Sequence, residues 1–175
     1  MRAYSLAYLT TSALKPADMV ALAAELGYRY VGLRLLPNAP GAPQQHLLGD
    51  AGALRETQQR MSDSGVGVFD LEIIRIGREF DPQQYLPLLE AGAVLGAHSL
   101  LVAGDDPDHS RLADNFARLC QLAGQYRLHA NLEFMPWTEI ANARAALRIV
   151  EGAARPNGGV LVDALHAGRS ATTAA

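Results

Sequence analysis

The sequence predicts an α/β protein built on a parallel sheet, and three observations support this fold class. Strand-like and helix-like segments alternate along the 175 residues, which is the order that gives parallel strands joined by right-handed crossovers. The expected strands begin about every 31 residues, the length of one strand–helix unit rather than of a short solenoid repeat. Since 49% of the residues are hydrophobic, the chain can bury a substantial core, and we expect a single domain over residues 1–175.

The expected elements of the first half are set by apolar spacing and by residues that start or stop helices. Pro16 suits the first turn of a helix, and Gly27 suits its end. In chain order, the elements are a strand over residues 4–9, a helix over 16–26, a strand over 29–35, a helix from Asp50 to Met61 and a strand over 66–75.

The second half continues the alternation. Asp81-Pro82 is expected to open a helix, and Ser110 and Thr138 are expected to cap two more. The intervening strands are expected over residues 98–103, 129–135 and 159–163, and no helix is expected from Gly168 to Ala175. Cys120 lies on the apolar side of its helix and is expected to be a core residue.

Two folds fit this alternation. A doubly wound sheet suits 175 residues, whereas a (β/α)₈ barrel normally needs about 250. The first strand–helix turn has no glycine-rich fingerprint, and no Walker-type sequence occurs in the chain, which disfavours nucleotide binding.

Composition excludes several classes of protein. The net charge of −3 and the pI near 5.9 argue against a nucleic-acid surface. The single cysteine cannot form an internal disulfide and fits a reducing compartment. The longest uncharged apolar run, residues 91–104, is too short to cross a bilayer, and no signal peptide is recognisable. We therefore expect a cytoplasmic protein with no nucleic-acid or membrane partner.

Candidate functional residues gather where the expected strands end, because parallel folds place their sites at the carboxyl ends of strands. In chain order they are Arg34, Asp70, Glu72, Arg75, Asp105, Asp106, Glu133, Trp137, Asp163, His166 and Arg169. His46, in the long loop after the second strand, is a further candidate for substrate contact.

Glu133 is the most informative of these residues. Strand alternation puts it on the face opposite Leu132 and Phe134. A carboxylate buried on that face needs a metal, an arginine or a substrate as its partner. A salt bridge to Arg34 is the structural alternative.

Asp163 follows the same logic, since it ends an otherwise apolar strand, and His166 comes three residues later. Carboxylates from adjacent strands can converge on Mg²⁺ or Mn²⁺, and an added imidazole admits Co²⁺ or Zn²⁺. The structural alternatives are a turn capped by Asp163 and an ordinary loop histidine at position 166.

The other candidates have equally balanced alternatives. Glu72 either hydrogen-bonds substrate hydroxyls or anchors Arg34. Arg34 and Arg75 either bind a phosphate or carboxylate group or are structural. Trp137 either walls a pocket or packs against a helix.

The segments Asn-Leu-Glu-Phe-Met-Pro-Trp (131–137) and Gly-Val-Leu-Val-Asp-Ala-Leu-His (159–166) resemble the sugar phosphate isomerase/epimerase family. This family belongs to the xylose isomerase-like TIM-barrel superfamily, which also includes apurinic endonucleases of the endonuclease IV type. The resemblance implies a (β/α)₈ barrel that is incomplete, with about six parallel strands and five helices and without strands seven and eight.

The resemblance also implies a divalent metal ion (Mn, Mg, Co or Zn) held by Glu133 and Asp163, with His166 beside the metal or the substrate. Glu133 would be one of two glutamates that move protons next to the carbonyl of a small sugar, sugar phosphate or hydroxy-ketone, through an enediolate. The histidine and glutamate that complete the family's metal site come from strands seven and eight. We therefore expect weak metal binding and little activity from this chain.

Two alternatives to an isomerase or epimerase remain. One is a lyase of the inosose or dehydroshikimate dehydratase type, and the other is a non-catalytic fragment or assembly module. A DNA-repair endonuclease ranks lower, because Arg34 and Glu72 stand where its histidine-rich metal cluster would need histidines. The exposed edges of an incomplete barrel also predict self-association.

Overall fold

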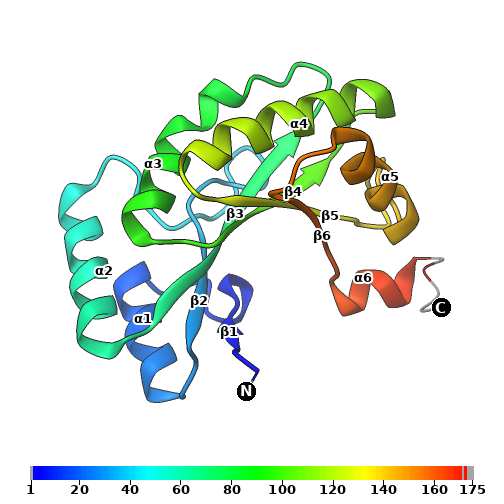
Figure 1. Cartoon of the computed structure of the whole chain (residues 1–175). Helices are drawn as coiled ribbons and strands as arrows, with labels where there is room; N and C mark the ends of the chain where they lie inside the picture. The colour runs from blue at the N-terminus through cyan, green and yellow to red at the C-terminus, as the bar shows by residue number, and fades with distance from the viewer. Residues whose placement is uncertain (1, 171, 173–175) are drawn as a thin grey trace. The chain divides into compact units, whose positions relative to one another are not determined.

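The computed structural model describes residues 2–170 and 172. Its six strands form one parallel sheet in which the spatial order equals the chain order (Figure 1). The strands are β1 (Ser5–Leu6), β2 (Tyr30–Arg34), β3 (Gly67–Ile76), β4 (Ser99–Gly104), β5 (His129–Glu133) and β6 (Gly158–Leu161). A doubly wound sheet reverses its strand order at a switch point. The unreversed order from β1 to β6 is that of a barrel wall, so the doubly wound alternative is wrong.

An α-helix connects each strand to the next, as predicted, and one further α-helix follows the last strand. The α-helices are α1 (Pro16–Glu25), α2 (Ala51–Ser64), α3 (Leu86–Leu95), α4 (His109–Gln125), α5 (Ala143–Ala153) and α6 (Ala164–Arg169). Short 3₁₀ helices, η1 (Tyr8–Thr10) and η2 (Pro82–Tyr85), precede α1 and α3. Among the described residues, no helix combines the length and the apolar character needed to cross a membrane.

Several predicted boundaries were wrong because another residue caps the helix. Asp50 caps α2 as predicted, accepting hydrogen bonds from two backbone N–H groups. Asp108 rather than Ser110 caps α4, and Asn142 rather than Thr138 caps α5. Thr138 instead closes a turn by bonding to backbone carbonyls on either side. In each case the true cap is Asp or Asn, which cap helices at least as well as Ser and better than Thr.

Two predicted segments differ more strongly from the structure. The first strand was expected over residues 4–9, but β1 ends at Leu6 and the chain turns into η1. No helix was expected after the sixth strand, yet α6 forms there and continues to Arg169, capped by Asp163.

The chain divides into two compact units. The first comprises Met1–Ile73 and Pro87–Ser99, and the second comprises Ile74–Leu86 and Leu100–Ala175. In the first unit α1 packs against α2. Its core includes Met19 and Val20 of α1 and Leu33 of β2, each fully buried.

In the second unit α4 packs against α5, and β5 pairs with β6 in parallel register. Phe116 and Cys120 of α4 are fully buried, which confirms Cys120 as a core residue. Burial raises the pKa of the Cys120 thiol to about 11, so the thiol stays protonated and unreactive at neutral pH.

Gly104, the last residue of β4, gives a test of packing in the second unit. A Cβ atom at this position would lie 2.8 Å from Ile140 and 2.9 Å from Leu112, both fully buried. Gly104→Ala should therefore lower the free energy of unfolding by about 1–3 kcal/mol, measured by urea denaturation. Gly77→Ala is the matched control, because a Cβ there meets nothing within 4 Å. Equal effects of the two substitutions would contradict the tight packing.

Candidate metal centre

Glu133, the last residue of β5, brings a carboxylate into the interior of the second unit. Glu133 is only 6% exposed, and its sequence neighbours Leu132 and Phe134 are fully buried. In the parallel pair with β6, Glu133 is in register with Leu161. Because Asp163 comes two residues after Leu161, the register places the next turn beside this carboxylate.

Asp163 and His166 lie in that turn. The Asp163 carboxylate accepts a hydrogen bond of 2.8 Å from the backbone N–H of His166 and so caps α6. This cap folds the imidazole back between the two carboxylates. Its Nδ1 lies 3.7 Å from Oδ1 of Asp163, and its Nε2 lies 3.7 Å from Oε1 of Glu133. The capping role expected as an alternative for Asp163 is therefore confirmed, and it is also what positions His166.

These three side chains form a candidate metal centre. Each offers one ligand atom, and the three atoms lie within 4.8 Å of one another. Nδ1 of His166 is buried and has no hydrogen-bond partner within residues 2–170 and 172, although a buried polar atom normally has one. Two carboxylate oxygens and one imidazole nitrogen fit a divalent cation such as Mn²⁺, Co²⁺ or Zn²⁺.

Trp137 lies at the edge of this centre. Its ring meets the His166 imidazole edge-on, with 4.8 Å between ring centroids, and 64% of the residue is exposed. The tryptophan therefore walls one side of the imidazole rather than packing into a helical interface. Arg169, at the end of α6, is also exposed.

Arg34 and Glu72 pair with each other in the first unit. They are partners in the parallel register of β2 and β3. Nε and Nη2 of Arg34 both donate to Oε2 of Glu72, at 2.9 and 2.6 Å. The guanidinium also lies 4.6 Å from the ring centroid of Tyr8. Glu72 thus anchors Arg34, which was one of its two expected roles. Tyr8 was missed, because its expected place in a strand gave no sign of this contact.

Asp70 lies two residues before Glu72, opposite Gly32 of β2. A Cβ atom at Gly32 would be 2.9 Å from Oδ1 of Asp70, so only glycine leaves room for the carboxyl group. Burial and, to a lesser extent, the negative charge of Glu72 raise the pKa of Asp70 to about 7.

The remaining charged candidates of the second unit are engaged in ion pairs. Arg75 pairs with Asp105. The fully buried Asp106 receives two hydrogen bonds of 2.6 Å from Arg111, which hold the pKa of its carboxyl group below the ordinary value. Asp105 and Asp106 therefore hold arginines that fix the loop after β4.

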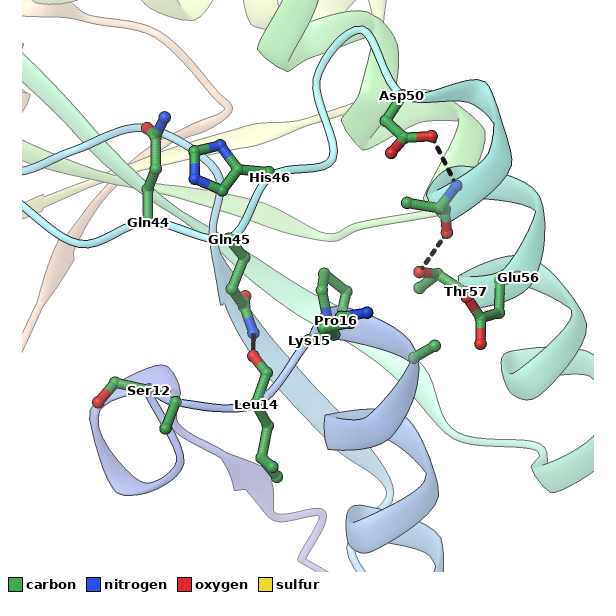
Figure 2. Close-up of a pocket in the computed structure, with 13 residues that line it drawn as sticks. Ser12, Leu14, Lys15, Pro16, Gln44, Gln45, His46, Asp50, Glu56 and Thr57 are labelled. Carbon is green, nitrogen blue, oxygen red and sulfur yellow. Dashed lines mark hydrogen bonds between the residues drawn. The ribbon is translucent and has the colours of Figure 1, made fainter.

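His46 lies in the first unit, where it helps to line a cavity between the turn that precedes α1 and the first turns of α2 (Figure 2). The predicted residues thus fall into separate groups. The metal centre gathers Glu133, Asp163, His166 and Trp137, while Arg34, Glu72 and His46 belong to the first unit.

Comparison with known proteins identifies the family. A model of the family described as xylose isomerase-like TIM barrel matches residues 20–172. None of the curated proteins is significantly similar to the chain in sequence.

Solved structures share the fold. D-allulose 3-epimerase from Methylomonas sp., in complex with D-allulose, superposes with a TM-score of 0.74 at 16% identity over 97% of this chain and 65% of its own. The probable 3-DHS dehydratase AsbF from Bacillus anthracis superposes with a TM-score of 0.74 at 16% identity, over 94% of this chain and 63% of its own. IOLI protein with a bound zinc atom superposes with a TM-score of 0.71 at 17% sequence identity. The match covers 93% of this chain and 63% of the IOLI chain. The chain thus spans somewhat less than two thirds of the length of these proteins.

The family match covers most of the chain, and the strand order is that of a barrel wall. Both confirm the resemblance and the α/β TIM-barrel fold expected from the sequence. The chain belongs to the xylose isomerase-like TIM-barrel family.

Proposed function

We propose that this chain supplies part of the metal site of an isomerase or epimerase that moves a proton next to the carbonyl of a small sugar, sugar phosphate or hydroxy-ketone. The observation that carries the proposal is the convergence of Glu133, Asp163 and His166, in which the buried Nδ1 of the imidazole makes no hydrogen bond to any described residue. Two structural neighbours support it, an epimerase bound to D-allulose and a protein bound to zinc.

Glu133 and Asp163 would hold a divalent metal ion. When bound, such an ion polarises a substrate oxygen and stabilises the negative charge that develops on it. Glu133, buried at the end of β5, is the candidate to accept and return the proton of the substrate carbon. His166, held by the α6 cap, would donate to or accept from a substrate hydroxyl, and the exposed ring of Trp137 would cover the apolar face of the sugar.

A dehydratase of the same family is the second candidate. AsbF superposes as well as the epimerase does, with the same TM-score of 0.74. Both reactions begin by removing a proton next to a carbonyl, so the same carboxylate serves either one.

Other parts of the hypothesis stay predictions. They are the substrate contacts of Glu72, Arg34, Arg75, His46 and Arg169, the cytoplasmic location, the absence of nucleic-acid and membrane partners, and self-association through the exposed edges of the sheet.

The metal site can be tested by isothermal titration with Mn²⁺, Co²⁺ and Zn²⁺. We expect weak binding that becomes at least about tenfold weaker in Glu133→Gln, because the amide removes the charge of one of the candidate ligands. Glu139→Gln, an exposed position of the same unit, is the matched control and should bind like the wild type. Unchanged affinity in Glu133→Gln would remove Glu133 from the site, and tight stoichiometric binding would contradict the expected weakness.

The reaction can be tested with D-allulose and with 3-DHS, each with and without the divalent ion. Slow turnover of one of them that a chelator abolishes would support the proposal and identify the reaction type. Turnover that survives the chelator would contradict a metal-dependent reaction. No turnover of either compound by the metal-loaded chain would favour the non-catalytic module.

A further inference from the structure

A second cavity of the first unit lies at the amino ends of β1, β2 and β3. It holds about 480 Å³, within the range of about 300–1,000 Å³ typical of ligand pockets. Tyr4, Arg29 and Val66 line it, and each directly precedes one of these strands. TIM-barrel enzymes carry out their reactions at the carboxyl ends of the strands, so a ligand bound here would not be the substrate of the proposed reaction.

Backbone hydrogen bonds hold the walls of this cavity together. The N–H of Arg29 donates to the carbonyl oxygen of Tyr4 at 3.1 Å, and the N–H of Gly67 donates to that of Arg29 at 3.0 Å. Gly27 and Gly65 follow α1 and α2 with positive φ, and a Cβ atom at either would meet nothing within 4 Å. The walls are therefore fixed around open space, which lowers the free-energy cost of ordering a bound ligand.

The charged side chains of the lining are two arginines. Arg2 and Arg29 are both exposed, and no Asp or Glu is among the described residues that line the cavity. The ion pairs of arginine within the described residues involve Arg34, Arg75 and Arg111, so neither guanidinium of the cavity is neutralised. The carboxyl ends of α1 and α2 contribute about half a negative charge each, which leaves about one net positive charge. The cavity therefore favours an anion.

Tyrosine rings lie beside these charges. Tyr4 is 65% exposed, and Tyr28 lines the same cavity. Nε of Arg29 donates to the hydroxyl group of Tyr30 at 3.4 Å, and the guanidinium carbon lies 5.7 Å from the centroid of that ring. The two Nη groups of Arg29 remain able to donate to the oxygens of an anion, and the exposed ring of Tyr4 can stack on an aromatic ligand.

We propose that this cavity binds a small aromatic anion of the aryl phosphate class. The phosphate group would accept hydrogen bonds from the guanidinium groups of Arg2 and Arg29, and the aromatic ring would stack on Tyr4. Guanidinium groups donate and never accept, so a ligand group rich in acceptors fits them better than a hydroxyl group does. The inference is independent of the proposed function, because no lining residue belongs to the candidate metal centre.

The test is titration of the metal-free chain with phenyl phosphate at low ionic strength, followed by saturation-transfer NMR of the ring protons. We expect a Kd of about 0.3–3 mM, given the efficiency normal for small ligands. Arg29→Gln should weaken binding at least about fivefold, because it removes one of the two charges that pair with the phosphate. Arg55→Gln, at an exposed position of α2 in the same unit, is the matched control and should bind like the wild type.

Two simpler compounds separate the charge of the ligand from its ring. Phenol, and inorganic phosphate followed by phosphorus NMR, should each bind at least about tenfold more weakly than phenyl phosphate, because each lacks one of the two contacts. Tyr4→Leu should weaken the binding of phenyl phosphate about threefold and leave that of inorganic phosphate unchanged, because it removes only the aromatic ring.

Several results would overturn the inference. Absence of saturable binding would exclude a ligand site here, and binding unchanged in both Arg29→Gln and Arg2→Gln would place the anion elsewhere. Phenol binding as tightly as phenyl phosphate would exclude an anion site. Inorganic phosphate binding as tightly would leave the ring without a role. None of these results bears on the proposed function, because the titrated chain is metal-free and keeps Glu133.

Discussion

Arg34→Met should lower the free energy of unfolding by about 3–5 kcal/mol, because it leaves a buried carboxylate without its counter-charge. The two side chains of the Arg34–Glu72 pair are only 11% and 9% exposed, so water cannot replace the guanidinium. The substitution also removes the cation from the ring of Tyr8. Urea denaturation followed by far-UV circular dichroism measures the change.

The double variant Arg34→Met/Glu72→Met separates the charge effect from lost packing. It should recover much of the loss, because a buried ion pair can be replaced by apolar side chains at little cost. Arg60→Met, at an exposed position of α2, is the control and should stay within about 0.5 kcal/mol of the wild type. A double variant as unstable as Arg34→Met would show that lost packing, rather than the unpaired carboxylate, causes the effect.

Asp70→Asn should stabilise the protein at pH 8 by up to about 4 kcal/mol. The folded state raises the pKa of Asp70 from 3.8 to about 7. Between these two values the folded protein binds more protons than the unfolded chain does, so this carboxyl group lowers stability as the pH rises from about 4 to about 7. An uncharged amide at position 70 removes that loss.

Unfolding free energies of wild type and Asp70→Asn at pH 5 and pH 8 check this prediction. The advantage of the variant should grow between the two pH values. Asp63→Asn, at an exposed position of α2, is the control. Its unfolding free energy should differ from that of the wild type by nearly the same small amount at pH 5 and at pH 8. An advantage of Asp70→Asn that does not change with pH would contradict the raised pKa.

The elements of the fold that depend on neighbouring residues alone could be predicted from the sequence. The alternation of apolar strands and amphipathic helices gave all six strands, and Asp50 gave the start of α2. Helix starts failed where several capping residues lie within a few positions, as at Asp108 and Ser110, because the choice depends on how the helix packs. The strand order, which decided between the barrel and the doubly wound sheet, could not be predicted from local sequence patterns, because it depends on which strands pair in space.

The candidate metal centre was predictable for a related reason. Strand alternation put Glu133 on the face away from Leu132 and Phe134, and Asp163 and His166 are brought together by a cap that spans three residues. The sequence offered Glu72 as a partner of Arg34 but could not decide between that role and a substrate contact. The choice depends on the register that sets Arg34 beside Glu72, 38 residues apart in sequence. The state of Asp70 likewise depends on the space left by Gly32 on the neighbouring strand.

The contact between Trp137 and His166 provides an optical reporter. The chain contains one tryptophan, and its indole lies edge-on to the imidazole with 4.8 Å between ring centroids. All of the emission excited through indole therefore originates beside the candidate metal centre. A paramagnetic ion such as Co²⁺ or Mn²⁺ at Glu133 and Asp163 would quench this fluorescence, whereas an ion bound elsewhere on the surface would leave it largely unchanged. The unlabelled protein can thus show where a metal binds as well as how tightly.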